Sequence, residues 1–157
     1  MARKQPAADQ VLRLDNQICF AIYSAAHAFN RVYKPLLDRL ALTYPQYLAM
    51  LVLWEHDNVP VKEIGERLFL DSGTLTPLLK RLEAAGLIKR TRSTEDERKV
   101  LIALTPQGQA LKDRARSVPL SILAASQCSV SELSDVKSEI TALRDRLNAA
   151  AEEVGAG

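Results

Sequence analysis

The chain has 157 residues, of which 47% are hydrophobic and 25% charged, and this is the size and composition of one globular domain. Six glycines and seven prolines are few for a loop-rich β-sandwich, and the uncharged stretch over residues 16–30 is too short and polar to span a bilayer. No apolar segment follows Arg3 and Lys4 as it would in a secretory signal peptide. We therefore expect a cytoplasmic protein that does not enter the membrane.

Helical spacing of apolar residues dominates the N-terminal part of the chain. Asp15 can cap a helix whose apolar side chains recur every three or four residues from Ile18 to Leu36. Thr43 is a second helix start, because the proline at position 45 is favoured in the first turn of a helix.

The next segment predicts a helix-turn-helix. Residues 61–68 form a short amphipathic helix. Asp71 and Ser72 then cap a second helix, and Gly86 is a glycine of the kind that ends one. Two short helices joined by a tight turn are typical of this motif.

A β-hairpin is predicted directly after the second helix. Residues 87–92 and 100–104 are its arms, and residues 93–99 form a charged tip. Thr105 and Pro106 then start a last helical region, which Pro119 and the serine-rich residues 126–131 interrupt.

This order of elements predicts a mainly α protein, a winged helix-turn-helix with N- and C-terminal helices that form a dimer interface. We expect one domain over residues 1–157, with residues 45–106 as the DNA-binding lobe. Residues 9–42 and 107–153 form the helical dimerisation region, because their apolar faces would have no partner in a monomer.

The charge distribution indicates one local patch that could meet a polyanion, and with the helix-turn-helix the expected partner is double-stranded DNA. The net charge is only +2, but residues 80–92 carry five basic side chains against one acid, whereas residues 128–157 carry three against six. One local basic patch is typical of a protein that meets a polyanion with part of its surface.

The helix that starts at Ser72 is the expected recognition helix. Its leucines at positions 75, 78, 79 and 82 would face inward. Hydroxyls, lysines and arginines on the other face can bond phosphates or base edges, and the helix N-terminus adds positive charge. The outward residues are Ser72, Thr74, Thr76, Pro77, Lys80 and Arg81.

The hairpin adds a second basic cluster, since an arginine at such a tip fits a narrow minor groove. We expect Asp96 to pair with Arg98 and shape the wing rather than touch DNA. A solvated helix with ordinary surface charge is the alternative, and the hairpin directly after it argues for DNA binding. The basic residues are Arg90, Arg92, Arg98 and Lys99.

The residues from Ser93 to Lys99, followed by Leu104 to Gly108, resemble the wing signature of the MarR family of repressors, and the similarity covers nearly the whole chain. The resemblance implies a MarR-like homodimer whose recognition helices enter successive major grooves. Such a dimer reads a pseudo-palindromic operator with half-sites about 10–10.5 bp apart, or a multiple of this.

Residues 14–24, 33–37 and 42–47 closely resemble the organic hydroperoxide sensors of that family, the two-cysteine OhrR subfamily. The resemblance implies that Cys19 is the redox-sensing residue and that organic hydroperoxides are the effector. It further implies that Tyr33 and Tyr44 hydrogen-bond to Cys19, with Tyr23 nearby. Cys128 of the other subunit would then resolve the oxidised form as a disulfide. The gene that such a repressor controls would be one for peroxide detoxification.

The chemistry of the residues supports this independently. With Asp15 as the cap, Cys19 lies about one turn inside a helix, where the dipole favours the thiolate, and tyrosine hydroxyls can donate to that charge. Fourteen helical residues separate Cys19 from Tyr33, about 21 Å along a helix axis. A Tyr33 that bonds Cys19 must therefore come from the partner subunit, with the two first helices antiparallel.

Other interpretations remain open. A cysteine in a helix is more often a small core residue, and Cys128 suits an incidental thiol as well as a resolving one. His27 and His56 lack the spacing of metal ligands, so we predict no metal and no other cofactor. A repressor released by a non-covalent phenolic ligand is the alternative function. A thiol peroxidase is the alternative from another class, but no acid–base pair accompanies Cys19, so we expect no enzyme.

Overall fold

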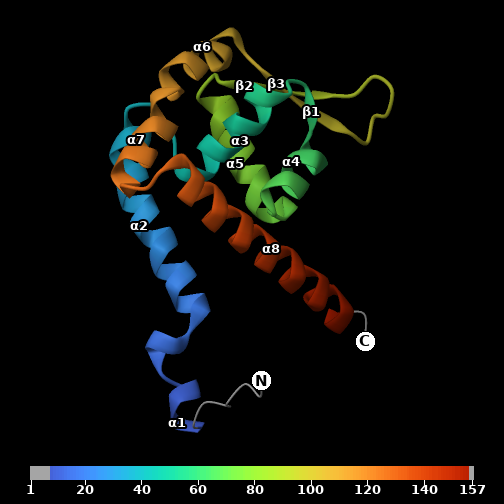
Figure 1. Cartoon of the computed structure of the whole chain (residues 1–157). Helices are drawn as coiled ribbons and strands as arrows, with labels where there is room; N and C mark the ends of the chain where they lie inside the picture. The colour runs from blue at the N-terminus through green and yellow to red at the C-terminus, as the bar shows by residue number, and fades with distance from the viewer. Residues whose placement is uncertain (1–7, 156–157) are drawn as a thin grey trace. The chain divides into compact units, whose positions relative to one another are not determined.

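The computed structural model describes residues 8–155, in which helices dominate and one small antiparallel sheet is present (Figure 1). The described chain divides into two compact units, one reaching as far as Val118 and the other beginning at Pro119. The helices are α1 (Ala8–Val11), the 3-10 helix η1 (Leu14–Asn16), α2 (Ile18–Asp38), α3 (Tyr44–Glu55), α4 (Val61–Leu68), α5 (Ser72–Ala84), α6 (Pro106–Ala115), α7 (Ser117–Ser126) and α8 (Val130–Gly155). The strands are β1 (Val59–Pro60), β2 (Ile88–Arg92) and β3 (Val100–Leu104).

The helix that carries Cys19 begins later than Asp15 predicts. Asp15 lies within η1, and the N-cap of α2 is Gln17, which makes no side-chain capping bond. Its amide Nε2 instead donates to the carbonyl oxygens of Val11 (2.7 Å) and Arg13 (2.9 Å). The prediction of Asp15 as cap is therefore wrong, and Cys19 is the second residue of α2, in its first turn.

The predicted starts of α3 and α5 are confirmed. Thr43 forms a capping box, in which its hydroxyl accepts from Gln46 N (3.3 Å) and its own N–H donates to Gln46 Oε1 (2.9 Å). Asp71 caps α5, because its Oδ1 accepts from Thr74 N (2.8 Å).

The predicted end of the second helix is also confirmed. Gly86 has a φ of 76°, which suits glycine, and Leu87 N donates to Leu82 O (3.1 Å). This left-handed cap turns the chain from α5 into β2. The two helices of the helix-turn-helix pack through leucines of α5 and Ile64 of α4, all buried.

The hairpin pairs with the register Ile88↔Leu104 to Arg92↔Val100. A two-residue strand that the sequence did not predict, β1, pairs with β3 through Val59↔Ile102, so the sheet order is β1-β3-β2. The loop between β2 and β3 extends away from the helices of this unit (Figure 1).

The last helical region is interrupted one turn earlier than predicted. The break lies at Arg116, and Pro119 is the third residue of α7. The N–H groups of a helix's first turn make no bond within the helix, so a proline there costs no hydrogen bond. The second predicted break is confirmed, since Gln127 to Ser129 separate α7 from α8. Among residues 8–155, no helix is both long and apolar enough to cross a bilayer.

Candidate functional site

The predicted recognition helix divides sharply between a buried and an exposed face. Its four leucines are at most 6% exposed. Of the predicted contacts, Thr76 is half-buried, and the exposed ones are Ser72, Thr74, Pro77, Lys80 and Arg81. The helix thus presents hydroxyls and two cations to solvent on a rigidly packed element.

A hydrogen bond between the recognition helix and the wing was not predicted from the sequence. The backbone N–H of Arg90 in β2 donates to Glu83 Oε2 near the end of α5 (3.0 Å). Because Glu83 follows Lys80 and Arg81 on the same helix, this bond ties the recognition helix to the first wing strand. Nothing in the sequence around Glu83, which follows the buried Leu82, predicted this contact with the wing.

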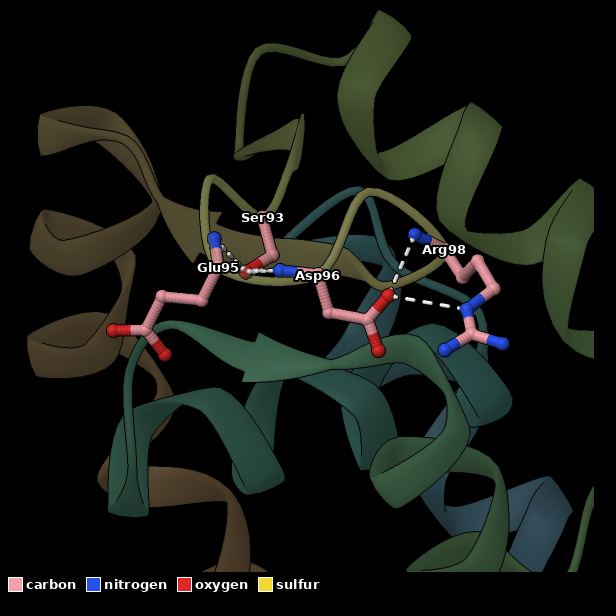
Figure 2. A network of polar contacts seen from close by, with 4 residues as sticks. All are labelled: Ser93, Glu95, Asp96 and Arg98. Carbon is pink, nitrogen blue, oxygen red and sulfur yellow. Dashed lines mark hydrogen bonds and ion pairs between the residues drawn. The ribbon is translucent and has the colours of Figure 1, made fainter.

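The wing tip is shaped by polar contacts among its own residues (Figure 2). Ser93 Oγ accepts from the backbone N–H groups of Glu95 (3.2 Å) and Asp96 (3.3 Å). Asp96 Oδ1 accepts from both N (3.1 Å) and Nε (3.3 Å) of Arg98. The Arg98 side chain is 92% exposed, so the ion pair adds little stability and acts on the shape of the loop. Arg92 and Lys99 are exposed beside it.

The joint between the recognition helix and the wing consists of Gly86 and Leu87, and the start of α6 holds it in place. Thr105 donates from Oγ1 to Gly86 O (2.5 Å) and from N to Leu87 O (3.1 Å). The backbone of Gly108 lies so close to Leu87 that a Cβ on residue 108 would be 2.0 Å from the carbonyl oxygen of Leu87. No other residue fits at this position without moving the joint.

Both cysteines are exposed free thiols. Among residues 8–155, no hydrogen-bond partner is present for the Cys19 thiol, and its helix neighbours Ile18, Phe20 and Ile22 are 61%, 41% and 36% exposed. Cys128 lies between α7 and α8, where its Sγ donates to Ser126 O (3.3 Å).

The structure brings two of the three predicted tyrosines together. The rings of Tyr33 in α2 and Tyr44 in α3 lie 4.8 Å apart. The ring of Tyr47, which was not predicted from the sequence, has its centre 6.0 Å from that of Tyr33 and 6.4 Å from that of Tyr44. Tyr23 lies elsewhere on α2, where its ring centre is 4.3 Å from that of His27. The spacing of Tyr44 and Tyr47 by three residues in one helix could have indicated the third member.

Burial extends to higher pH the range over which these phenols stay protonated. It raises the pKa of Tyr33 to about 12, with smaller contributions from the neighbouring Tyr44 and Tyr47 phenols. Burial also raises the pKa of Tyr44 and of Tyr47. A protonated phenol is a hydrogen-bond donor, so the cluster can stabilise an anion brought to it. Cys19 of the same chain is not that anion, since fourteen residues of α2 separate it from Tyr33.

The known sequences that are similar to this chain include transcriptional regulators. Residues 31–115 match the family described as transcriptional regulator SarA/Rot. The organic hydroperoxide resistance transcriptional regulator of Bacillus subtilis (strain 168) is 52% identical over 137 residues, which cover 87% of this chain and 93% of the relative. The HTH-type transcriptional regulator TtmR of Methylorubrum extorquens (strain PA1) is 50% identical over 94% of this chain and 75% of its own length.

Solved structures of AbfR, a protein of Staphylococcus epidermidis, are also similar. Reduced AbfR bound to DNA gives a TM-score of 0.76 at 35% identity, covering 91% of this chain and 98% of that one. AbfR with its disulfide formed gives 0.61 at 35% identity, covering 92% and 96%. These matches cover most of the chain, so the likeness extends beyond the helix-turn-helix.

Proposed function

Because this chain belongs to the winged-helix transcriptional regulators of the SarA/Rot and MarR type, of which OhrR is a member, we propose that it is a repressor that organic hydroperoxides release from DNA. Its relatives are transcriptional regulators rather than enzymes. The observation that carries the sensing part of the proposal is the pair of half-buried phenols Tyr33 and Tyr44, whose ring centres lie 4.8 Å apart. Tyr33 lies on α2, the helix that also carries Cys19, and Tyr44 is the first residue of α3.

The sensor is completed by a second copy of the chain. Residues 9–32 are exposed throughout, although they include Ile18, Phe20, Phe29 and other apolar side chains. Burying such a face is favourable in proportion to its area, and an antiparallel α2 of the partner subunit would cover it.

Antiparallel pairing also supplies the missing hydrogen-bond partner. A two-fold axis at residue 26, midway between 19 and 33, puts each Cys19 beside the partner's Tyr33. Ala25, Ala26 and Ala28 are small, which allows two helices to approach closely at that crossing. The dimerisation region over residues 9–42 and 107–153 therefore remains our proposal, with the sensor site shared between subunits.

Cys19 is suited to react as a thiolate in this site. It is the second residue of α2, where the unpaired N–H groups of the first turn attract negative charge. The phenols of the partner subunit would donate to the same sulfur. The exposed apolar neighbours Phe20 and Ile22 favour an alkyl or aryl peroxide over hydrogen peroxide.

The reaction then follows from thiol chemistry. The Cys19 thiolate attacks one peroxide oxygen, the O–O bond breaks, and the departing alkoxide takes a proton to leave as an alcohol. Sulfur is thereby oxidised to a sulfenic acid. The partner subunit's Cys128 attacks this sulfur, which forms an intersubunit disulfide and releases water.

Release of DNA requires a modest free energy. A hundredfold drop in operator affinity corresponds to about 2.7 kcal/mol between the reduced and oxidised dimers. Loss of the bonds from Tyr33 and Tyr44 to the thiolate would shift the two recognition helices away from the spacing of successive major grooves.

The proposal is tested by Cys19→Ser. Operator DNA is selected from a random pool by the reduced wild-type protein, and binding is measured by fluorescence anisotropy with and without cumene hydroperoxide. We expect wild type to release the DNA and to rebind it after dithiothreitol, and Cys19→Ser to bind equally well and ignore the peroxide. Peroxide-driven release of Cys19→Ser would place the sensor elsewhere, and release of it by a phenol such as salicylate would support the non-covalent alternative.

The role of Cys128 is tested separately. Cys128→Ser should still react with cumene hydroperoxide but stop at a sulfenic acid that dimedone can trap. On a nonreducing gel, oxidised wild type should migrate as a covalent dimer and the variant as a monomer. A covalent dimer of unchanged yield in Cys128→Ser would remove this residue from the mechanism.

A further inference from the structure

Four aromatic rings form a continuous chain from the tyrosine cluster along α3. Tyr33 and Tyr44 both contact Tyr47, and the ring of Tyr47 meets that of Trp54 edge-on at 6.5 Å. These separations lie within the range in which aromatic rings interact. Tyr47 is 2% exposed and Trp54 9%, so the chain runs through the core rather than over the surface.

The far end of this chain is tied to α6. The indole Nε1 of Trp54 donates to Gly108 O (3.0 Å), and Lys112 Nζ donates to Trp54 O (2.9 Å). The end of α3 and the first two turns of α6 are thus joined by one hydrogen bond in each direction. An indole N–H is a directional donor, so rotating the ring lengthens or breaks the bond to Gly108.

Gly108 in turn sets the joint between the recognition helix and the wing. It is packed against the carbonyl of Leu87, the residue between the glycine cap of α5 and the start of β2. Thr105, three residues earlier, holds both Gly86 and Leu87 by hydrogen bonds. A displacement of the start of α6 is therefore felt at the joint, because close-packed interiors have no slack to absorb it.

We propose that Tyr47 and Trp54 are positioning residues that transmit the state of the sensor tyrosines to the joint between the recognition helix and the wing. This inference rests on the proposed function, since it needs oxidation of Cys19 to change what Tyr33 and Tyr44 bond. Tyr47 touches both of those rings, so it must move when they reorient. Trp54 follows it, and its bond to Gly108 carries the change to Leu87.

The first test uses Trp54 itself, the one tryptophan in the sequence. Its fluorescence reports directly on its surroundings, without any substitution at the site. On treatment of the wild-type dimer with cumene hydroperoxide, we expect the emission to change at the same rate as DNA is released. Cys19→Ser should show no change. Release of DNA with constant Trp54 emission would overturn the inference.

The second test is Trp54→Phe, which removes the indole N–H and keeps an aromatic ring against Tyr47. The measured quantity is the ratio of operator dissociation constants in the oxidised and reduced states. Relative to wild type, we expect this ratio to fall about tenfold, while the rate of Cys19 oxidation stays unchanged. Tyr47→Leu, which interrupts the chain one step earlier, should lower the ratio in the same way and weaken the emission change.

Leu53→Val is the matched control, because Leu53 lies beside Trp54 in α3, is 1% exposed and makes none of the ring contacts. It should lose stability and keep the wild-type ratio. An equal fall in Leu53→Val and Trp54→Phe, or no fall in Trp54→Phe, would overturn the inference while the proposed function stands. If wild-type protein itself does not release DNA with peroxide, the proposed function fails and the inference fails with it.

Discussion

Residues 43–115 and the N-terminal part of α2, residues 18–32, differ in how much of their geometry this chain supplies by itself. The first region has a buried core, capped helices and a hairpin closed by its own hydrogen bonds. In the second, every residue is exposed, including six large hydrophobic side chains. The winged helix is therefore complete in one chain, whereas the region around Cys19 has no buried environment of its own and, in our proposal, is one half of a site shared between subunits.

The difference also explains how sensing could be coupled to DNA binding. A sensor built from two subunits changes the dimer when it reacts, and the distance between two recognition helices is a property of the dimer. A lobe that is rigid by itself moves as a body when its base moves, rather than losing its shape. The following changes separate the two regions, beginning with the largest expected effect.

Gly108→Ala should damage the self-contained region. The added methyl would meet Leu87 O at 2.0 Å, and backbone on both sides resists movement. We expect the free energy of unfolding to fall by about 3 kcal/mol, measured by urea denaturation of the reduced protein. Gly155→Ala is the control, since nothing lies within 4 Å of its added methyl, and it should lose no stability. Equal stability of the two variants would contradict the close packing of this joint.

Lys80→Ala and Arg81→Ala should weaken DNA binding and leave the sensor intact. Both side chains are exposed on α5. For each phosphate that a chain no longer neutralises, the slope of log affinity against log salt should become shallower by about one unit. Titrations of operator DNA at several salt concentrations give the slope. Lys137→Ala in α8 should leave it unchanged, and a similar reduction there would mean that general charge rather than α5 binds DNA.

The smallest effect concerns the tyrosine cluster at high pH. Burial raises the pKa of Tyr33 from 10.0 to about 12 in the folded chain, so folding favours the protonated phenol. The buried, protonated Tyr33 phenol contributes fully to the free energy of unfolding below pH 10, and this contribution is lost as the pH rises toward 12. The reason is that the phenol of the unfolded chain ionises at lower pH than that of the folded chain. Ultraviolet titration of phenolate should show ionisation near pH 12 that Tyr33→Phe reduces, while Tyr44 and Tyr47, whose pKa burial also raises, still ionise late. An ionisation near pH 12 that is unchanged in Tyr33→Phe would assign the raised pKa to another tyrosine.

Much of the winged helix was predictable from the sequence because its signals are local. Thr43, Asp71 and Gly86 mark helix ends through bonds to residues at most five positions away, and the structure confirms all three. Asp15 failed as such a signal, because it lies within η1 and Gln17 is the N-cap of α2, with its side chain bonded to the preceding turn. A short local pattern is reliable only where no competing local bond exists.

The long-range contacts could not be predicted from the sequence. Strand β1 has two residues, one of them proline, and exists because β3 offers a free edge. The contact from Trp54 to Gly108 joins residues 54 positions apart, and no spacing rule predicts it. Tyr33 and Tyr44 were expected to act together, and their rings do lie together, but their relation to Cys19 of a second chain stays a prediction.

The shared sensor site is tested most directly with mixed dimers. One chain carries Cys19→Ser and keeps Tyr33, and the other carries Tyr33→Phe and keeps Cys19; each homodimer is defective. If the partner supplies the tyrosine, the mixed dimer contains one intact site, and its remaining Cys19 should react with cumene hydroperoxide at the wild-type rate. A rate equal to that of the Tyr33→Phe homodimer would contradict a site built across two subunits.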